Sequence, residues 1–152
     1  KRYDIKGRAY IGTPLKYYFS DVGLRNARLN FRQQEETHII ENILYNELSS
    51  RGFSVDVGVV EYNWKDDAER SRRSQLEVDF VLNKADKRYY IQSAFTVATQ
   101  EKKDQELNSL LRIDDSFQKL VVVKDDILPW TDEHGISYIN VQDFLLDAID
   151  RL

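Results

Sequence analysis

One acidic residue, Asp79, stands within a pair of predicted strands at a place where a carboxylate could do chemistry. It lies in the strand-like run of residues 75–82, which a short turn at 83–86 joins to a second strand at 87–95, as expected for a hairpin. A carboxylate in this setting can ligate a divalent cation. Alternatively, it can bind backbone amides and have a structural role only. The first alternative predicts a hydrolytic site in which the cation activates water.

Two glutamates on a predicted helix at residues 35–50 are further candidates. Apolar residues at helical spacing form one stripe along this helix: Ile40, Ile43, Leu44 and Leu48. Glu41 lies at the edge of the stripe and Glu47 nearer its middle. A buried carboxylate has to be paired or hydrogen-bonded, so Glu47 is either a satisfied core acid or a second acid facing Asp79. His38 and His134 have no partner at metal-ligand spacing and are expected on the surface.

The elements that must position these residues follow from periodicity and turn signals. Residues 1–19 contain two short strands, which either pair with the main sheet or belong to the tail of an upstream domain. A polar connection follows as far as residue 34. The remaining predicted elements are a helix at 35–50, a strand at 53–64, an exposed charged loop at 65–74, strands at 75–82 and 87–95, a helix at 99–113, strands at 118–123 and 135–141, and a closing helix at 143–152. This α-β-β-β-α-β-β-α order predicts an α/β fold with helices packed on a mixed sheet.

Composition narrows the classes of protein. The 152 residues suit a single domain. The absence of cysteine excludes disulfides and thiolate metal sites and favours a reducing, cytoplasmic setting. No apolar run reaches the length of a membrane helix, so no membrane partner is expected. The net charge of −4 argues against non-specific nucleic-acid binding. The absence of methionine is expected of a piece excised from a longer protein.

Four segments, in this order and spacing, carry a resemblance to a known family: residues 16–24 (KYYFSDVGL), 41–48 (ENILYNEL), 77–81 (EVDFV) and 90–92 (YIQ). Together with the α-β-β-β-α-β core, they resemble the C-terminal restriction-endonuclease-like domain, of the PD-(D/E)XK type, of a bacterial and archaeal AAA+-type ATPase family. The resemblance covers nearly the whole chain. It implies an upstream P-loop ATPase module and a winged-helix-like middle part. Residues 1–30 would then be an N-terminal extension that ends the winged-helix-like part, and residues 31–152 the nuclease-like domain.

The resemblance also implies an incomplete catalytic set. Asp79 takes the position of the first acid and Glu41 that of a helix acid, so these two are the expected ligands of a Mg²⁺ ion. Gln92 stands where a second acid is expected, and Ala94 where a lysine is expected. An amide brings no charge to a cation, and alanine cannot orient water, so efficient hydrolysis is not expected. Lys102 or Lys103, on the next helix, could supply a migrated lysine.

The sequence therefore predicts a degenerate, non-catalytic nuclease-like domain that recognises nucleic acid or protein. ATP would be bound only by the upstream module, because this chain has no G-x-x-x-x-G-K-[ST] segment. Two alternatives stay open: an active Mg²⁺-dependent nuclease with a migrated lysine, and a pure protein-interaction module. The basic rim expected around Asp79 for DNA consists of Lys87, Arg88, Lys102 and Lys103. Other expected partners are the upstream ATPase module, a second copy of the chain, or a partner protein.

Overall fold

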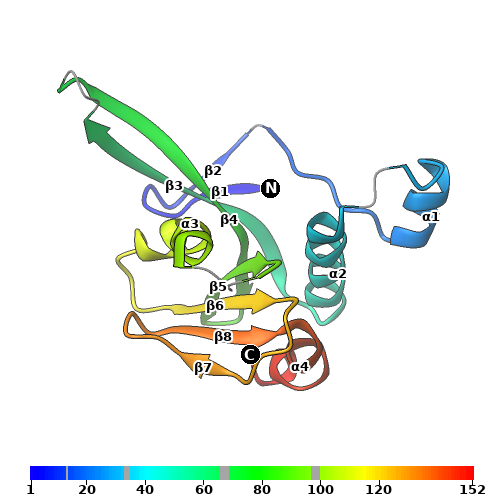
Figure 1. Ribbon diagram of the computed structural model, residues 1–152. Coiled ribbons are helices and arrows are strands. Elements are labelled where there is room, and N and C mark those ends of the chain that lie inside the picture. The colour runs from blue at the N-terminus through cyan, green and yellow to red at the C-terminus, as the bar shows by residue number, and fades with distance from the viewer. Residues whose placement is uncertain (13, 33–34, 66–68, 97–99) are drawn as a thin grey trace.

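The computed structural model describes residues 1–152 except 13, 33–34, 66–68 and 97–99, and it leaves the side chains of 100–103, 105–106 and 151 undescribed. Eight strands form one mixed sheet in the order β2-β1-β3-β4-β5-β6-β8-β7 (Figure 1). The strands are β1 (Arg2–Asp4), β2 (Ala9–Ile11), β3 (Ser54–Lys65), β4 (Ser71–Lys84), β5 (Lys87–Ala94), β6 (Gln118–Val123), β7 (Trp130–Thr131) and β8 (Ile136–Asn140). β3, β4 and β5 form an antiparallel meander, and β6 returns parallel to β5. The expectation of an α/β fold with a mixed sheet is confirmed.

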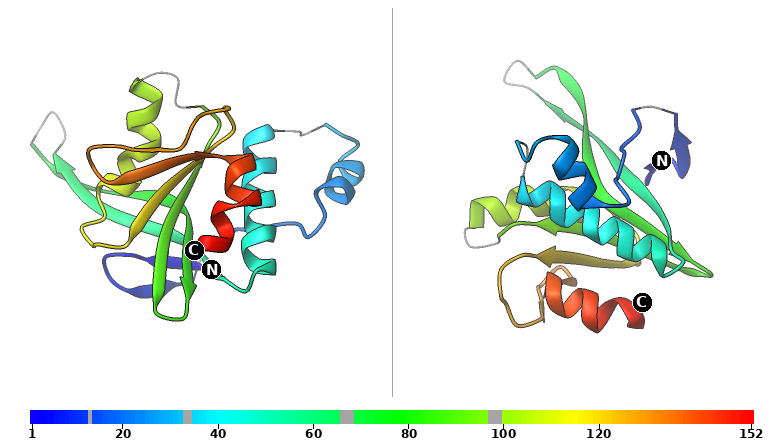
Figure 2. Two further views of the ribbon diagram at one scale, coloured as in Figure 1. Left: turned by 90° about the horizontal axis from the view of Figure 1, so that it is seen from below. Right: turned by 90° about the vertical axis from the view of Figure 1, so that its right-hand side faces the viewer.

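Helices cover both faces of this sheet (Figures 1 and 2). The helical elements are α1 (Val22–Arg28), α2 (Glu36–Ser50), α3 (Gln100–Leu111), α4 (Val141–Leu146) and a final 3₁₀ helix (Ala148–Arg151). On one face, Leu107 and Leu110 of α3 pack on Tyr90 and Val121; we call this the α3-side core. On the other face, α2 and α4 pack on Phe80 and Ile91; we call this the α2/α4-side core. No helix among the described residues is long and apolar enough to cross a membrane.

The N-terminal residues pair with the main sheet, which was one of the two alternatives expected for them. β1 lies parallel to β3, with Tyr3 opposite Gly58, and β2 pairs antiparallel with β1 at the sheet edge. Ile5 is buried in the α3-side core. The domain boundary expected at residue 30 stays a prediction.

Three predicted elements differ from those observed. The polar connection expected up to residue 34 contains α1, which begins where the Asp21 carboxylate accepts a hydrogen bond from the Leu24 amide at 2.8 Å. The closing helix expected at 143–152 starts instead at Val141, capped by Asn140, and a 3₁₀ helix follows it. The sequence analysis also did not predict β7.

In the charged loop expected at 65–74, residues 65 and 71–74 are strand, and residues 66–68 lie outside the described residues. β3 runs to Lys65 and β4 starts at Ser71, so the two strands form a long ribbon that projects from the body (Figure 1). Contacts between the two strands hold the ribbon together. Arg73 forms an ion pair with Glu61, and the Trp64 indole donates to the Ser74 hydroxyl at 2.8 Å. These polar cross-strand pairs replace the apolar alternation from which a strand is usually predicted.

Candidate functional site

Asp79 faces helix α2 because β4 contains a β-bulge. The register of β3 and β4 shifts at this place: Asp56 pairs with Val81, whereas Gly58 pairs with Val78. Two residues of β4, Asp79 and Phe80, therefore lie opposite the single residue Val57. The extra residue breaks the strict alternation of sides along the strand. As a result, Val78 and Val81 both face the α3-side core, and the Asp79 side chain is on the same face as Phe80.

Gly58 is the residue that permits this bulge. A Cβ atom at position 58 would lie 2.8 Å from Ile5 Cδ1, 2.9 Å from Val78 Cβ and 2.9 Å from Val81 Cγ2. These atoms can approach the β3 backbone so closely only because glycine has no side chain.

The backbone pairing of strands β4 and β5 ends at Phe80. At Asp79, hydrogen bonds that involve side chains connect the two strands instead. The backbone pairing of the two strands runs from Lys84↔Lys87 to Phe80↔Ile91. Beyond Phe80, the Asp79 amide donates to Gln92 Oε1 at 3.3 Å. Asp79 Oδ2 accepts bonds from the Ser93 amide at 2.8 Å and from the Ser93 hydroxyl at 3.0 Å. The structural role considered for Asp79, binding a backbone amide, is thus realised through one of its two oxygens.

The other oxygen of Asp79 faces a lysine from the N-terminal segment. Lys16 Nζ lies 2.5 Å from Glu41 Oε1, 2.7 Å from Glu77 Oε1 and 3.9 Å from Asp79 Oδ1. We call these four residues the Lys16 cluster. Only about a quarter of the Lys16 side chain is exposed, and the Asp79 and Glu41 side chains are buried. One ammonium group is therefore shared by three carboxylates that come from helix α2 and strand β4, and it can balance the charge of only one of them.

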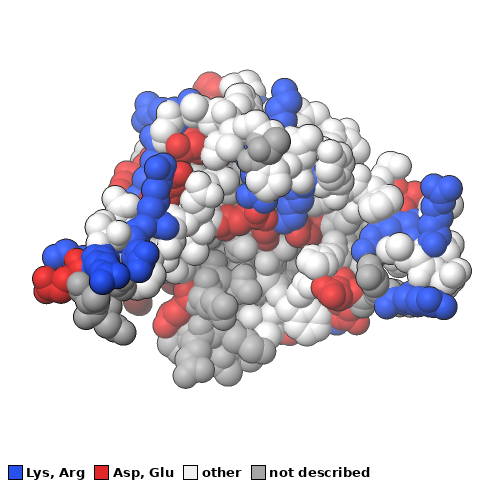
Figure 3. All heavy atoms as spheres, turned by 90° about the horizontal axis from the view of Figure 1, so that it is seen from above, with Lys and Arg blue, Asp and Glu red and all other residues white. Residues whose placement is uncertain are grey.

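Two more residues complete the surroundings of the cluster. The Tyr18 hydroxyl donates to Glu41 Oε1 at 2.6 Å, and its ring stacks on Tyr45 with the centroids 4.0 Å apart. Arg2 forms an ion pair with the second oxygen of Glu77 at 2.7 Å. On the face drawn in Figure 3, acidic and basic side chains lie side by side near the middle.

Burial and neighbouring charges shift the protonation of the cluster. Burial raises the pKa of Asp79 to about 7, and the negative charge of Glu41 adds to this, while the Ser93 bonds and Lys16 oppose it. Burial alone would lower the pKa of Lys16, but its bonds to Glu41 and Glu77 outweigh burial and raise it. Burial and Glu41 also raise the pKa of Tyr18. The cluster thus keeps a protonated lysine and a protonated tyrosine, while Asp79 can gain or lose a proton near neutral pH.

The Lys16 ammonium group lies among the carboxylates of the cluster. Among the described residues, no three Asp, Glu or His side chains are arranged to ligate one metal ion. Lys16 Nζ lies between the carboxylates instead, and Gln92 Oε1 is engaged with the Asp79 amide. Ala94 is buried in the α3-side core, so position 94 does not face the cluster. The Mg²⁺ site expected at Asp79 and Glu41 stays a prediction.

The structure brings together Asp79, Glu41 and Gln92, as predicted, but not the other candidates. Glu47 is neither a core acid nor a partner of Asp79, because its carboxylate is 44% exposed and pairs with Arg51 at 3.5 Å. Ile43, assigned to the inner stripe of the helix, is also exposed. Lys87 donates to the Leu152 carbonyl, and Arg88 stacks between Tyr3 and Phe117. Both residues lie at the opposite end of β5 from Gln92, so they form no rim around Asp79. The side chains of Lys102 and Lys103 lie outside the described residues.

Lys16 and Glu77, which complete the cluster, were not among the residues predicted for the site. Glu77 precedes Asp79 by two residues and belongs to the segment 77–81. Lys16 lies in a stretch without regular secondary structure, far in sequence from its partners. The only signal for it is its place in the segment 16–24, which contributes to the resemblance.

Comparison with known proteins identifies one distant relative. A protein of Haemophilus influenzae, described as "Uncharacterized protein", is 34% identical to the chain over 146 residues. The match covers 96% of this chain and 32% of the relative, so the chain spans about a third of the length of that relative. No protein-family model matches the chain, and no solved structure matches it.

Proposed function

We propose that this chain is a restriction-endonuclease-like domain in which an internal lysine occupies the site of the cation, and that it serves recognition rather than hydrolysis. The element order α2-β3-β4-β5-α3-β6 supports this proposal. So does the convergence of Asp79, Glu41 and Gln92 where β4 and β5 separate.

The position of Lys16 Nζ is the observation that carries the proposal. It lies within hydrogen-bonding distance of Glu41 and Glu77 and 3.9 Å from Asp79, where carboxylates would otherwise hold a divalent cation. A divalent ion would have to displace an ammonium group whose pKa is raised by these same carboxylates. The protonated lysine therefore competes with metal binding, which hydrolysis in this fold requires.

We further propose that the parent protein is a AAA+-type ATPase and that ATP is turned over only in its upstream module. The segments 16–24, 41–48, 77–81 and 90–92 support this assignment by resemblance. The greater length of the Haemophilus influenzae relative is compatible with additional modules.

A protein is the partner that the surface favours. Large apolar side chains are exposed before, on and just after α1: Leu15, Tyr17, Phe19, Leu24, Leu29 and Phe31. Exposed apolar residues gathered in this way are typical of protein interaction sites. The basic rim expected for DNA is not supported by the positions of Lys87 and Arg88.

An active nuclease is the second candidate, because a lysine does lie beside Asp79. In that function Lys16 would be the migrated lysine, and Asp79 and Glu41 would bind Mg²⁺. The raised pKa of Lys16 would keep it protonated, so it would stabilise negative charge rather than accept a proton.

A DNA cleavage assay separates the two candidates. The wild-type chain, Asp79→Ala and Lys16→Met would each be incubated with supercoiled DNA and Mg²⁺ or Mn²⁺. The proposal expects no cleavage by any of the three, and no saturable Mg²⁺ binding by the wild type in calorimetry. Cleavage by the wild type that both substitutions abolish would establish the nuclease. Lys124→Met serves as the control, because Lys124 forms an exposed pair with Glu36 outside the cluster.

A further inference from the structure

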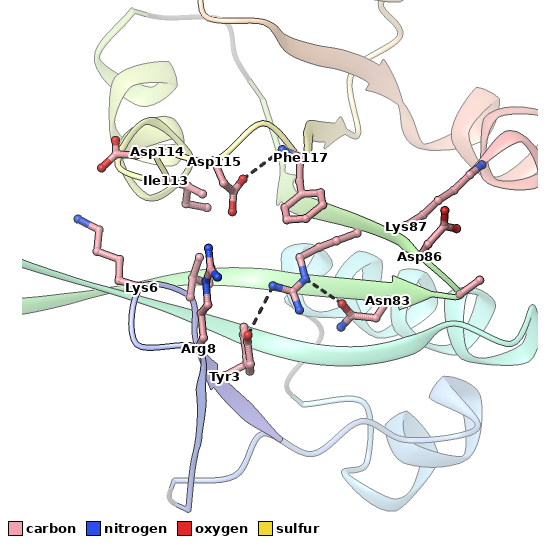
Figure 4. Close-up of a pocket in the computed structure, with 13 residues that line it drawn as sticks. Tyr3, Lys6, Arg8, Asn83, Asp86, Lys87, Ile113, Asp114, Asp115 and Phe117 are labelled. Carbon is pink, nitrogen blue, oxygen red and sulfur yellow. Dashed lines mark hydrogen bonds between the residues drawn. The ribbon is translucent and has the colours of Figure 1, made fainter.

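A second polar site lies at the other end of strands β4 and β5. A pocket of about 570 Å³ opens between the β1–β2 connection, the β4–β5 turn and the segment that follows α3 (Figure 4). Its volume lies within the range of small-molecule sites. It shares no residue with the Lys16 cluster.

Two cations that line this pocket have no side-chain partner among the described residues. Lys6 and Arg8 are exposed and line the pocket from the β1–β2 connection. Within the part of the chain that the structure describes, neither the Lys6 amine nor the Arg8 guanidinium has a hydrogen bond or an ion pair. In Figure 4, Arg8 points toward the segment that carries Ile113 and Asp115. Arg8 also has a φ of 52°, a conformation that costs free energy in a residue other than glycine.

A third cation, Arg88, is held rigidly in the pocket. Its guanidinium lies 5.0 Å from the centroid of the Tyr3 ring and 5.5 Å from that of Phe117, as in cation–π contacts. Its Nε donates to Asn83 Oδ1 at 2.8 Å. A guanidinium fixed in this way presents its remaining donors to an anion with little loss of entropy.

The wall opposite these cations offers a fixed acceptor. Asp115 Oδ2 accepts the Tyr90 hydroxyl at 2.6 Å, and Oδ1 accepts the Phe117 amide at 3.2 Å. The Phe117 ring beside it is 40% exposed. Figure 4 shows that Lys87 and Asp86 extend away from Arg8 and Asp115. The pocket thus combines two cations that lack a partner within the described part of the chain with a carboxylate acceptor and an aromatic surface.

We propose that this pocket binds a mononucleotide-sized phosphate ester. Lys6 and Arg8 would bind the phosphate, since arginine and lysine donors form the strongest hydrogen bonds to such anions. Asp115 would accept a hydrogen bond from an amino or hydroxyl group at the other end of the ligand. The exposed Phe117 ring would contact a planar base. The proposal is independent of the function of the Lys16 cluster.

Isothermal titration calorimetry with AMP and GMP tests the site, with adenosine and inorganic phosphate as partial ligands. The test variant combines Lys6→Gln with Arg8→Asn. The control is Lys84→Gln, which removes a positive charge at the end of β4, outside the pocket. Asparagine is chosen at position 8 because it tolerates positive φ. Lys84 is a suitable control because it lies over the Phe53 ring in the α2/α4-side core, on the opposite face of the sheet.

We expect a nucleotide to bind at a single site and more tightly than inorganic phosphate. The double variant should weaken binding by at least about tenfold, because charge-assisted hydrogen bonds are lost, while Lys84→Gln should bind as the wild type does. The absence of nucleotide binding at millimolar concentration would overturn the proposal. Undiminished binding by the double variant would overturn the location, and equally tight binding of inorganic phosphate would overturn the nucleotide assignment.

Discussion

Lys16 and Tyr18 donate hydrogen bonds to the same oxygen atom, Glu41 Oε1, at 2.5 Å and 2.6 Å. Both donors come from a segment without regular secondary structure, and the acceptor comes from helix α2. The segment is therefore attached to the body of the domain by bonds to a buried carboxylate. The stability of this attachment depends on charge as much as on apolar packing.

Removing the Lys16 charge should destabilise the fold. In Lys16→Met the apolar stem is kept, but Glu41, Glu77 and Asp79 lose their shared cation. Breaking a buried ion pair from one side typically costs about 3 kcal/mol, and urea unfolding would measure the loss. The control Lys124→Met, at an exposed pair, should cost less than about 1 kcal/mol. Equal losses in the two variants would show that the cluster is not a buried ion pair.

Asp79→Asn should make the protein more stable at pH 8. The pKa of Asp79 in the folded protein, about 7, lies above its ordinary value of 3.8, so the folded state binds a proton more tightly than the unfolded state. The contribution of Asp79 to the free energy of unfolding therefore falls as pH rises from about 4 to about 7, by up to roughly 4 kcal/mol. Asparagine removes this loss and can still accept the Ser93 bonds.

Melting curves of Asp79→Asn and the wild type across this pH range would check the sign of the effect. The two should be similar near pH 4, and the variant should melt at higher temperature above pH 7. A wild type whose stability rises between pH 4 and pH 7 relative to the variant would contradict the prediction. The ionised Asp79 would then be a net stabilising group.

Tyr18→Phe should lose the bond to Glu41 and keep the stack on Tyr45. A hydrogen bond to a charged group contributes about 1.5–3 kcal/mol, so we expect a loss in the lower part of that range by chemical denaturation. Tyr17→Phe is the neighbouring control, because Tyr17 is 79% exposed. If the two variants were equally stable, the short distance from Tyr18 to Glu41 would carry no net energy.

Gly58→Ala should disturb the β-bulge. The added methyl group would lie within 3 Å of Ile5, Val78 and Val81, and overpacking of this kind costs about 1–3 kcal/mol. Gly12→Ala is the control, since no atom lies within 4 Å of a Cβ there. Thermal melting would compare the two variants. If Gly58→Ala melted at the same temperature as the wild type, the bulge would not require glycine at position 58.

Periodicity predicted the main elements because they bury apolar side chains. Helix α2 and the buried strand β6 follow from spacing and composition alone. The bulge could not be predicted, because strict alternation puts Asp79 on the same side as Val81, away from α2. Nor could Lys16, whose role depends on contacts with residues 25, 61 and 63 positions further along the chain. Asp79 and Glu41 were found because they belong to regular elements, whereas the cation they share belongs to none.

The separation of β4 from β5 divides one strand into two halves that should differ in amide hydrogen exchange. From Val81 to Asn83, β4 is paired with strands on both sides, β3 and β5. From Ser71 to Gln75, within the ribbon that projects from the body, the described strand pairing of β4 is with β3 alone. Amides in the first half should exchange only on global unfolding, and those in the second half through local opening. Asp79 lies between the two halves, so local opening of the ribbon should end near this residue.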